Sequence, residues 1–306
     1  MIDKSIFNTS TLSDVRDKTE SWLSCIRYQD AIVAQVPALT GILFSVESLT
    51  VEMFPRILSC TIASFFLMAH IFAFNDWVDK MVDYRDPCKK ESNFLSKRIA
   101  HLEMLSISII LGIVSVLIFA MLSYQLLVLS SIGIVLSLVY SFPVQALQGK
   151  RIPILSSVLH FIGSSIAFLL GYVLFSEIDE KGLLIAFYFS FIFVAGHLVQ
   201  EVQDFKGDQK NGIRTHAVQF GPNQMFITAN IIFTLSFIYL FWLGYINLIP
   251  SFLKYLVFFY PAYLFMAIAV ARKGLDYHTI KRFRTQYRLL YGVIVAIISL
   301  SVITLY

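Results

Sequence analysis

The stretch NDWVDKMVD at residues 75–83 follows a long apolar run and carries three carboxylates at spacings of three and four residues. If a helix continues through it, Asp76, Asp79 and Asp83 share one face over about two turns. Three carboxylates on one face repel one another unless a cation lies between them, and Mg²⁺ is a divalent ion that suits their hard oxygens. A single acidic triplet is more typical of a solvated helix end, so this stretch alone leaves both interpretations open.

The composition is typical of a membrane protein with several spans. Of the 306 residues, 57% are hydrophobic and 14% are charged, and the mean hydropathy is +0.72. A soluble chain is about half apolar and about a quarter charged. The first 25 residues are polar, which predicts that there is no cleavable signal peptide. Apolar runs near the ~20 residues that a bilayer core requires predict spans at 31–49, 55–74, 102–121, 124–142, 154–175, 183–199, 223–246, 252–271 and 289–305.

The basic residues orient these nine predicted spans. Of the 24 Lys and Arg residues, 21 precede the first span or lie in the loops after even-numbered spans, and only Arg56, Lys181 and Lys254 lie on the other side. The positive-inside rule therefore predicts a cytoplasmic N-terminus, cytoplasmic loops after the even-numbered spans and a C-terminus on the far side. These loops account for the net charge of +4, and nothing in the sequence indicates a nucleic-acid or protein partner.

A second acidic triplet follows the sixth predicted span. Glu201, Asp204 and Asp208 have the same spacing as the first triplet and lie 125 residues after it. This register predicts an internal parallel repeat, in which spans one to four match spans five to eight. We expect a single all-α membrane domain, residues 1–306, with nine transmembrane helices around a central cavity. In it, 1–30 is a cytoplasmic segment, and 76–101 and 200–221 carry the acidic motifs as cytoplasmic cap segments.

Six carboxylates on two facing helix ends predict a functional site, because acids at a membrane boundary are costly otherwise. They suit two or more Mg²⁺ ions, which in turn bind a polyanion such as a diphosphate. The Phe-rich interior beneath them would accept a hydrocarbon chain, so an isoprenoid diphosphate is the predicted substrate. The basic residues expected to neutralise the remaining phosphate charge are Lys80, Arg85, Lys150, Arg151, Lys206 and Arg214.

Three motifs resemble those of the UbiA superfamily of intramembrane prenyltransferases. Residues 75–83 resemble its first aspartate-rich motif, and 201–215, followed by Phe220-Gly221, is similar to its second. Tyr140-Ser141-x-Pro143, with Lys150 downstream, resembles the stretch that ends the fourth span in this family. With nine predicted spans and the predicted orientation, the resemblance covers nearly the whole chain.

The resemblance implies Mg²⁺-dependent ionisation of a prenyl diphosphate and transfer of the prenyl group, within the membrane, to an aromatic or lipid-like acceptor. The coordinated metal would stabilise the leaving diphosphate, and the cavity would shield the allylic cation from water. It implies catalytic roles for Asp76, Asp79, Asp204 and Asp208. It further implies that Asn75, Asp76, Asp79 and Asp83 hold one Mg²⁺, and that Asp204 and Asp208 hold the other with assistance from Glu201.

The sequence departs from the family pattern at three places. The Arg-Pro that is common after the first motif is missing from 92–98, so Lys89, Lys90 or Arg98 could supply that diphosphate contact. Glu201 replaces the commoner Asp, and His216 replaces an apolar residue. The residues expected to line the substrate cavity are Tyr140, Ser141, His160, His197 and Gln200. The basic segment 275–288 is interpreted as a positive-inside anchor and not as a substrate site.

Two other functions are compatible with these motifs. A membrane terpene cyclase of the same superfamily would use the same donor chemistry, but the cation would be captured by its own double bonds. A cation-coupled transporter or lipid-binding protein would use the acids to coordinate a coupling ion. Inverted repeats with broken helices at the membrane midplane would favour a transporter, whereas these acids are predicted at helix ends on one side.

Overall fold

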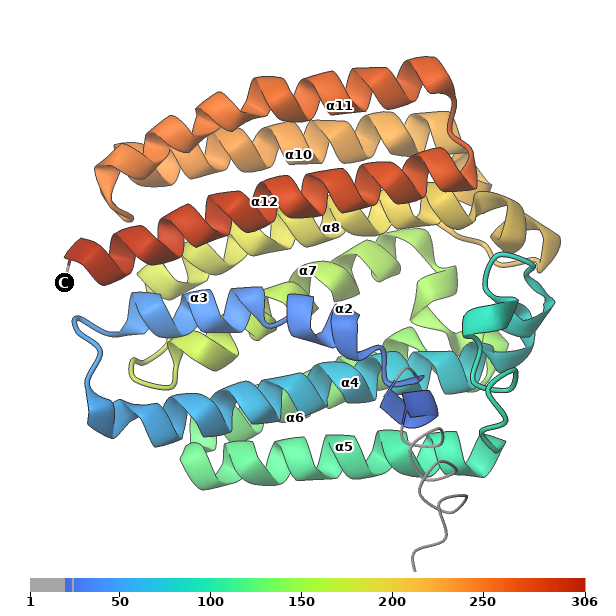
Figure 1. Ribbon diagram of the computed structural model, residues 1–306, viewed down its shortest axis with the longest axis horizontal. Coiled ribbons are helices and arrows are strands. Elements are labelled where there is room, and N and C mark those ends of the chain that lie inside the picture. Colours follow the sequence, from blue (N-terminus) through green and yellow to red (C-terminus); the bar gives the residue numbers. More distant parts are fainter. Residues whose placement is uncertain (1–19, 24, 306) are drawn as a thin grey trace, which may run out of the picture.

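The computed structural model describes residues 20–23 and 25–305. These residues form a helical bundle whose long helices run side by side (Figure 1), and the described part contains no β-strand. Most of the predicted N-terminal segment 1–30, including Lys4, Arg16 and Lys18, lies outside the described residues. The helices are α2 (Tyr28–Val33), α3 (Val36–Ser45), α4 (Phe54–Arg85), α5 (His101–Leu122), α6 (Tyr124–Tyr140), α7 (Pro153–Tyr172), α8 (Glu180–Lys210), α9 (His216–Phe220), α10 (Pro222–Tyr245), α11 (Tyr260–Lys273) and α12 (Tyr277–Leu305), with the 3₁₀ segment η6 (Ser251–Phe259) before α11.

The described residues contain seven helices that are long and apolar enough to cross a membrane, judged by length and composition. They correspond to the predicted spans two, three and five to nine. The fourth predicted span is the shorter apolar helix α6. The prediction of an all-helical protein with many spans is therefore confirmed for these residues.

The first predicted span, 31–49, is not one continuous helix. It consists of α2, which ends at Val33, and α3, which has only 10 residues. Pro37 lies in the first turn of α3. Because proline has no N–H and its ring clashes with the carbonyl group four residues earlier, it kinks or breaks a helix, and here α2 ends at that residue, Val33. The expected continuous span is thus replaced by two short helices.

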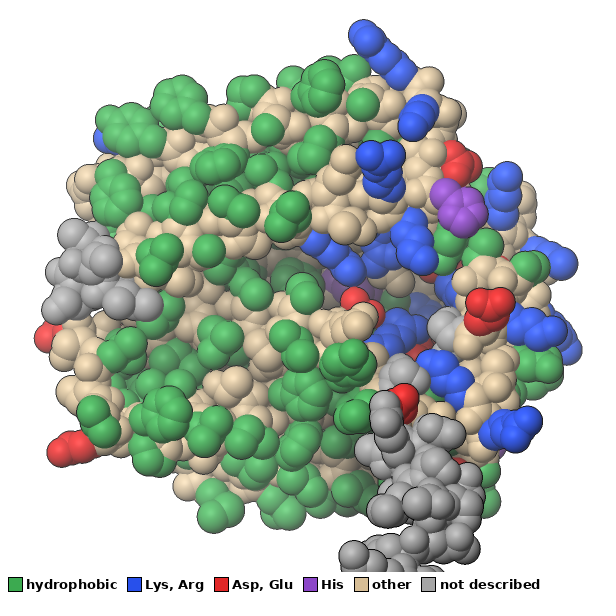
Figure 2. Space-filling view, viewed as in Figure 1, with side chains coloured by type: hydrophobic (Ala, Val, Ile, Leu, Met, Phe, Trp, Pro, Cys, Tyr) green, Lys and Arg blue, Asp and Glu red, His purple; other side chains and the backbone are tan. Residues whose placement is uncertain are grey.

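The connections between helices alternate between the two ends of the bundle. Both acidic motifs lie at the end where α4 and α8 finish and where α5, α10 and α12 begin (Figure 1). We call this the cap end, formed by the connections 86–100, 141–152, 211–221 and 274–276. Lys and Arg side chains gather at the cap end, whereas most of the coloured side chains on the rest of the visible face are hydrophobic (Figure 2).

Two glycines allow α3 and α7 to cross with their backbones in contact. A Cβ atom on Gly171 would lie 1.8 Å from the carbonyl oxygen of Ala38, and one on Gly41 would lie 2.2 Å from that of Phe168. Neither position therefore has room for a side chain. Such close crossings are typical of helices that pack in membranes, where small residues bring backbones together.

Candidate active site

One large cavity lies inside the bundle and reaches the cap end. Its volume is about 1020 Å³, and residues of α2, α3, α4, α6, α7, α8 and α12 line it. The visible face of the molecule is hollowed between α12 and the α2–α3 segment (Figure 2). The cavity combines a polar region near the acidic motifs with an apolar wall that includes Leu67, Phe189 and Ile192.

Both acidic motifs line this cavity. The α4 and α8 helices continue through the motifs to Arg85 and Lys210, so the spacing of three and four residues places each acidic set on one face. All seven predicted metal ligands belong to the cavity wall: Asn75, Asp76, Asp79 and Asp83 from α4, and Glu201, Asp204 and Asp208 from α8.

Lys89 links the two motifs. Its ammonium nitrogen lies 2.9 Å from a carboxylate oxygen of Asp204 and 3.6 Å from one of Asp83. Burial alone would lower the pKa of Lys89, but the negative charges of Asp204 and Asp83 outweigh it and raise this pKa above its ordinary value. The carboxylates of the two helices are therefore close enough to bind a single cation between them.

Lys150 and Ser141 contact the first motif from the segment after α6. The buried ammonium group of Lys150 forms an ion pair with Asp79 and donates to Oδ1 of Asn75 at 3.3 Å. The hydroxyl group of Ser141 donates to the same Asn75 oxygen at 2.8 Å. Tyr140 lines the cavity, but Ser141 is not part of its wall. The three motifs found in the sequence thus converge on one place.

Arg27 is a cavity residue that the sequence predictions counted only as a positive-inside charge. Its guanidinium group binds the Asp76 carboxylate through two nitrogens, at 2.9 and 2.6 Å. This bidentate geometry is the strong form of an Arg–carboxylate pair, and the charge of Asp76 raises the pKa of Arg27 further. Arg27 adopts a left-handed backbone conformation with φ of 49°, which is uncommon for a residue other than glycine.

Five of the six basic residues predicted to contact the diphosphate do not line the cavity; only Lys150 does. Lys80 contacts His101 at the start of α5, and Arg151 donates to the carbonyl oxygen of Gly212 at 3.2 Å. Lys206 and Arg214 are exposed. For Lys206 the reason is helical geometry, because a residue two positions from both Asp204 and Asp208 points to another face of the helix. Lys80 lies four residues after Asp76 and three before Asp83, so its spacing does not exclude it from the cavity, but its ammonium group contacts His101.

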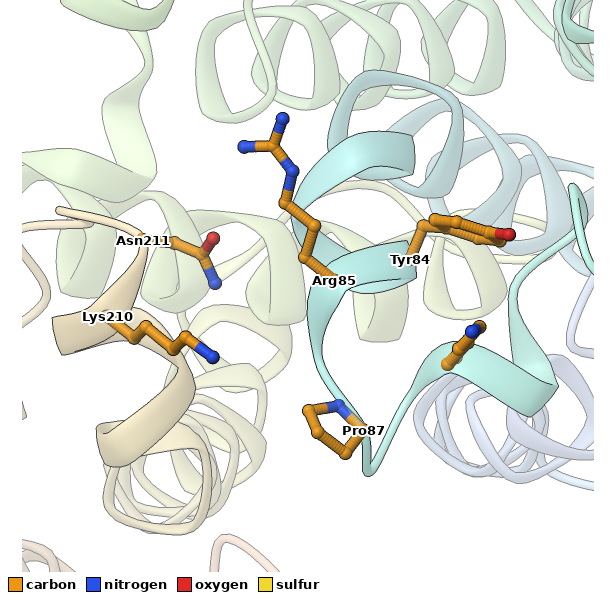
Figure 3. Close-up of a pocket in the computed structure, with 6 residues that line it drawn as sticks. Tyr84, Arg85, Pro87, Lys210 and Asn211 are labelled. Atoms are coloured by element: carbon orange, nitrogen blue, oxygen red, sulfur yellow. The ribbon is translucent and has the colours of Figure 1, made fainter.

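Arg85 lies instead at a separate surface pocket of about 600 Å³ at the cap end. Arg85 and Tyr84 come from the end of α4, and Lys210 and Asn211 from the end of α8 and the residue after it (Figure 3). Lys90 also lines this pocket, with its ammonium nitrogen 5.2 Å from the centre of the Tyr84 ring. Of the three residues named as substitutes for the missing Arg-Pro, only Lys89 lines the large cavity.

The two residues that depart from the family pattern, Glu201 and His216, contact each other. Nδ1 of His216 lies 3.1 Å from both carboxylate oxygens of Glu201, and Nε2 of His197 lies 3.0 Å from one of them. The backbone N–H of Ala217 also donates to Glu201. All three side chains are buried. The carboxylate of Glu201 is therefore bound by two imidazole groups, whereas Asp204 is paired with Lys89 and no imidazole group contacts Asp204 or Asp208 among the described residues.

His160 lies against this cluster. Its ring stacks on that of His197 with centres 3.7 Å apart, and its Nδ1–H donates to the carbonyl oxygen of Ser156 at 3.0 Å. His160, His197 and Gln200 all line the cavity, as expected from the sequence. They form the part of its wall that lies next to the second motif.

The basic segment 275–288 forms part of the cavity wall. This position corrects the interpretation of the segment as a positive-inside anchor that has no place at the site. Six of its residues line the cavity: Tyr277, Lys281, Arg284, Thr285, Tyr287 and Arg288. Arg284 donates to the side-chain oxygens of Gln200 and Gln203, both at 2.9 Å. Tyr277, Lys281, Arg284 and Arg288 are separated by four, three and four residues, which is the spacing of residues on one helix face. This spacing is the sequence signal that could have identified them as part of the cavity wall.

Solved structures of other proteins share this fold. The structure superposes on a UbiA homolog from Archaeoglobus fulgidus bound to GPP and Mg²⁺, with a TM-score of 0.73 and 17% identity, covering 93% of this chain and 99% of that one. It also superposes on a digeranylgeranylglyceryl phosphate synthase, with a TM-score of 0.66 and 17% identity, covering 94% and 99%. An uncharacterized protein of A. fulgidus is 25% identical over 143 residues, which are 45% of this chain and half of that relative.

At these low sequence identities, the structural similarity shows only that the fold is shared. The sequence model of the UbiA prenyltransferase family matches residues 34–298, which is most of the chain and includes all three motifs. The family match and the seven long apolar helices make this an integral membrane protein with several spans. The match confirms the resemblance found in the motifs, and the chain belongs to the UbiA prenyltransferase family.

Proposed function

We propose that this protein transfers a prenyl group from an isoprenoid diphosphate to an aromatic or lipid-like acceptor within the membrane, with Mg²⁺ as its cofactor. The observation that carries this proposal is the convergence of two acidic motifs, from α4 and α8, on one cavity in which Lys89 contacts both. A diphosphate is the natural ligand of such a site, because metal ions and ammonium groups together match its charge. The apolar part of the cavity suits the prenyl chain.

The side chains present fit Mg²⁺. The first motif and the aspartates of the second supply only hard oxygen donors, and they already attract the cationic groups of Arg27, Lys89 and Lys150. When bound, the metal ions would neutralise the diphosphate and stabilise the charge that develops as the C–O bond breaks. Glu201 only assists the binding of the second metal ion in this proposal, since its oxygens are held by two imidazole groups. The proposed ligands are Asn75, Asp76, Asp79 and Asp83 for one ion, and Asp204 and Asp208 for the other.

The cationic side chains of the site have a second role in this proposal. Lys89 and Lys150 end within ion-pair distance of motif carboxylates, so they can bind phosphate oxygens when the diphosphate enters. The bundle around them excludes water from the reacting carbon, which protects an allylic cation from hydrolysis. Tyr140, His160 and His197 form the nearby wall, and the ring of Tyr140 supplies an aromatic face that can stabilise positive charge.

We also infer that the chain crosses the membrane nine times, with α2–α3 as one broken crossing, and that the cap end is cytoplasmic. The concentration of Lys and Arg at this end supports the orientation. A parallel repeat of 125 residues is supported by the helix bounds: adding 125 to those of α4 yields 179–210, and α8 is Glu180–Lys210. The segments 76–101 and 200–221 would then cap a single membrane domain on the cytoplasmic side.

Removal of the metal ion tests the proposed function. We expect the purified protein to release diphosphate from labelled GPP only when Mg²⁺ is present. Chelation with EDTA should lower the rate to the uncatalysed level, and added Mg²⁺ should restore it, because the carboxylates cannot neutralise a diphosphate by themselves. The measurement is diphosphate release together with chromatography of the labelled products.

The products of the same experiment separate the competing functions. A cyclic product formed without any acceptor would identify a terpene cyclase and overturn the transferase proposal. Intact donor at every Mg²⁺ concentration and with every acceptor would overturn both enzymatic functions. A prenylated acceptor would establish the transferase.

The Glu201→Gln variant tests the assignment of ligands. Because Glu201 is bound by His197 and His216, we expect this variant to need nearly the same Mg²⁺ concentration for half-maximal activity as the wild type, even if its turnover falls. The Asp208→Asn variant should need about tenfold more Mg²⁺ or more, since loss of a ligand weakens metal binding directly. An equal shift in both variants would make Glu201 a full metal ligand.

A further inference from the structure

We propose that His197, Glu201 and His216 form a binding site for Zn²⁺, separate from the aspartates assigned above to Mg²⁺. Their ligand atoms, two imidazole nitrogens and one carboxylate oxygen, all lie within 4.8 Å of one another. All three side chains are buried. This site goes beyond the proposed function, in which Glu201 only assists the binding of Mg²⁺, and it does not depend on prenyl transfer.

The three ligand atoms meet at one carboxylate oxygen. Oε1 of Glu201 lies 3.0 Å from Nε2 of His197 and 3.1 Å from Nδ1 of His216. The ligand atoms of a tetrahedral zinc ion, bound at about 2.0–2.1 Å, are about 3.3 Å apart, so small shifts place all three around one ion. His197 and Glu201 are one turn apart on α8 and share a helix face, and His216 begins α9.

The His197 nitrogen that faces Glu201 has more oxygen neighbours than it has hydrogens. Nε2 of His197 also lies 2.8 Å from the hydroxyl oxygen of Ser156. A neutral imidazole nitrogen carries either one hydrogen or one lone pair, so a single hydrogen would be shared between the hydroxyl group and the carboxylate. A zinc ion in place of that hydrogen binds the nitrogen and the carboxylate together.

Neighbouring groups orient the ligands as a metal ion requires. Nε2 of His216 lies 3.1 Å from the hydroxyl oxygen of Ser157 on α7. A hydrogen on Nε2 is donated to that oxygen, which leaves the lone pair on Nδ1 for the metal. The other oxygen of Glu201 accepts from the backbone N–H of Ala217 at 3.3 Å. Metal-binding imidazole and carboxylate groups are typically fixed by such partners.

The ligand types favour zinc over magnesium. Imidazole nitrogen suits Zn²⁺, whereas Mg²⁺ prefers the oxygen ligands that the two acidic motifs supply. Two His and one Glu are a known zinc ligand set, which leaves a fourth position for water. His197 and Glu201 line the large cavity, so water can reach this position from there. The bound ion would fix α9, within the connection 211–221, to α8 beside the second motif.

Metal analysis of the full-length protein tests this proposal. The purified, untagged protein is stripped with a chelator and then dialysed against Zn²⁺ with Mg²⁺ in large excess, so that Mg²⁺ occupies the oxygen sites. We expect the wild type to retain about one zinc ion per chain, measured by mass spectrometry of the metal. His216→Phe should bind zinc about a hundredfold more weakly, because it removes one of three ligands. No prenyl donor is present, so the result is independent of the proposed function.

Two variants serve as controls for the place of the ion. His278 is exposed on α12, so His278→Phe should bind zinc like the wild type. Asp208→Asn should also retain zinc, although it weakens the binding of Mg²⁺. Loss of zinc from Asp208→Asn together with retention by His216→Phe would place the ion at the acidic motifs and overturn the proposal. A wild type that retains no zinc would overturn it as well.

Further measurements separate a lost ligand from a folding defect. His216→Asn keeps a hydrogen-bond donor beside Glu201, so it should have the thermal midpoint of the zinc-free wild type and still lose zinc. Zn²⁺ at about a hundredfold above its Kd should raise the wild-type midpoint by about 5 °C and leave that of His216→Asn unchanged. Co²⁺ in place of zinc should give the wild type the strong visible absorption of a four-coordinate ion. The weak absorption of six-coordinate Co²⁺, or an equal rise in both midpoints, would refute the site.

Discussion

Replacing Asp79 or Asp204 by Asn is expected to slow Mg²⁺-dependent diphosphate release from labelled GPP by about a thousandfold or more, which corresponds to about 4 kcal/mol of lost transition-state stabilisation. Each substitution removes one negative charge from the set of carboxylates that lines the cavity. The two residues belong to different motifs, so a comparable loss in both variants would show that both helices hold the reacting diphosphate. The measurement is single-turnover release of labelled diphosphate at saturating Mg²⁺.

A change in folding must be separated from this loss of activity. Asp79 is the ion-pair partner of Lys150, which is only 7% exposed, so Asp79→Asn leaves a buried cation without its partner and should also lower stability. Adding Lys150→Met to Asp79→Asn should recover the thermal midpoint in detergent but not the activity. Glu177→Gln, at an exposed carboxylate in the connection between α7 and α8, serves as the charge control and should behave like wild type. Unchanged turnover in both Asp79→Asn and Asp204→Asn would refute the site.

Gly171→Ala is expected to destabilise the bundle by about 3 kcal/mol or more, because an added methyl group cannot be accommodated without separating two helices. The new Cβ would lie 1.8 Å from the carbonyl oxygen of Ala38, which is a backbone atom and cannot rotate away. The helices α3 and α7 must then move apart, and the α3 segment that carries part of the cavity wall moves with them. The measurement is the thermal midpoint of the purified protein in detergent.

Gly163→Ala on the same helix is the matched control. A Cβ at Gly163 would meet no atom within 4 Å, so this variant should be as stable as wild type, or more stable by up to about 1 kcal/mol because Ala favours the helix. Equal midpoints for the two variants would contradict the close crossing of α3 and α7. A low midpoint for Gly171→Ala alone would establish that the backbones are in contact there.

Much of the site could be predicted because it depends on local periodicity. The spacing of Asp76, Asp79 and Asp83 places them on one helix face wherever that helix packs, and the same holds for the second motif. The register of 125 residues and the alternation of basic loops then bring both motifs to one end of the bundle. Even the break between α2 and α3 has a local cause in Pro37, although a hydropathy window does not detect it.

The sequence by itself determined the helices, the two carboxylate faces and the end of the bundle at which they meet, because helix periodicity and hydrophobic length are properties of neighbouring residues. Only the tertiary structure decided which cationic groups reach the cavity. Arg27 and Asp76 are 49 residues apart, and Lys89 and Asp204 are 115 apart, so spacing could not pair them. The contact between Glu201 and His216 and the cavity face of α12 depend in the same way on how separate segments pack, since the direction of a side chain is set by the face that its own element buries.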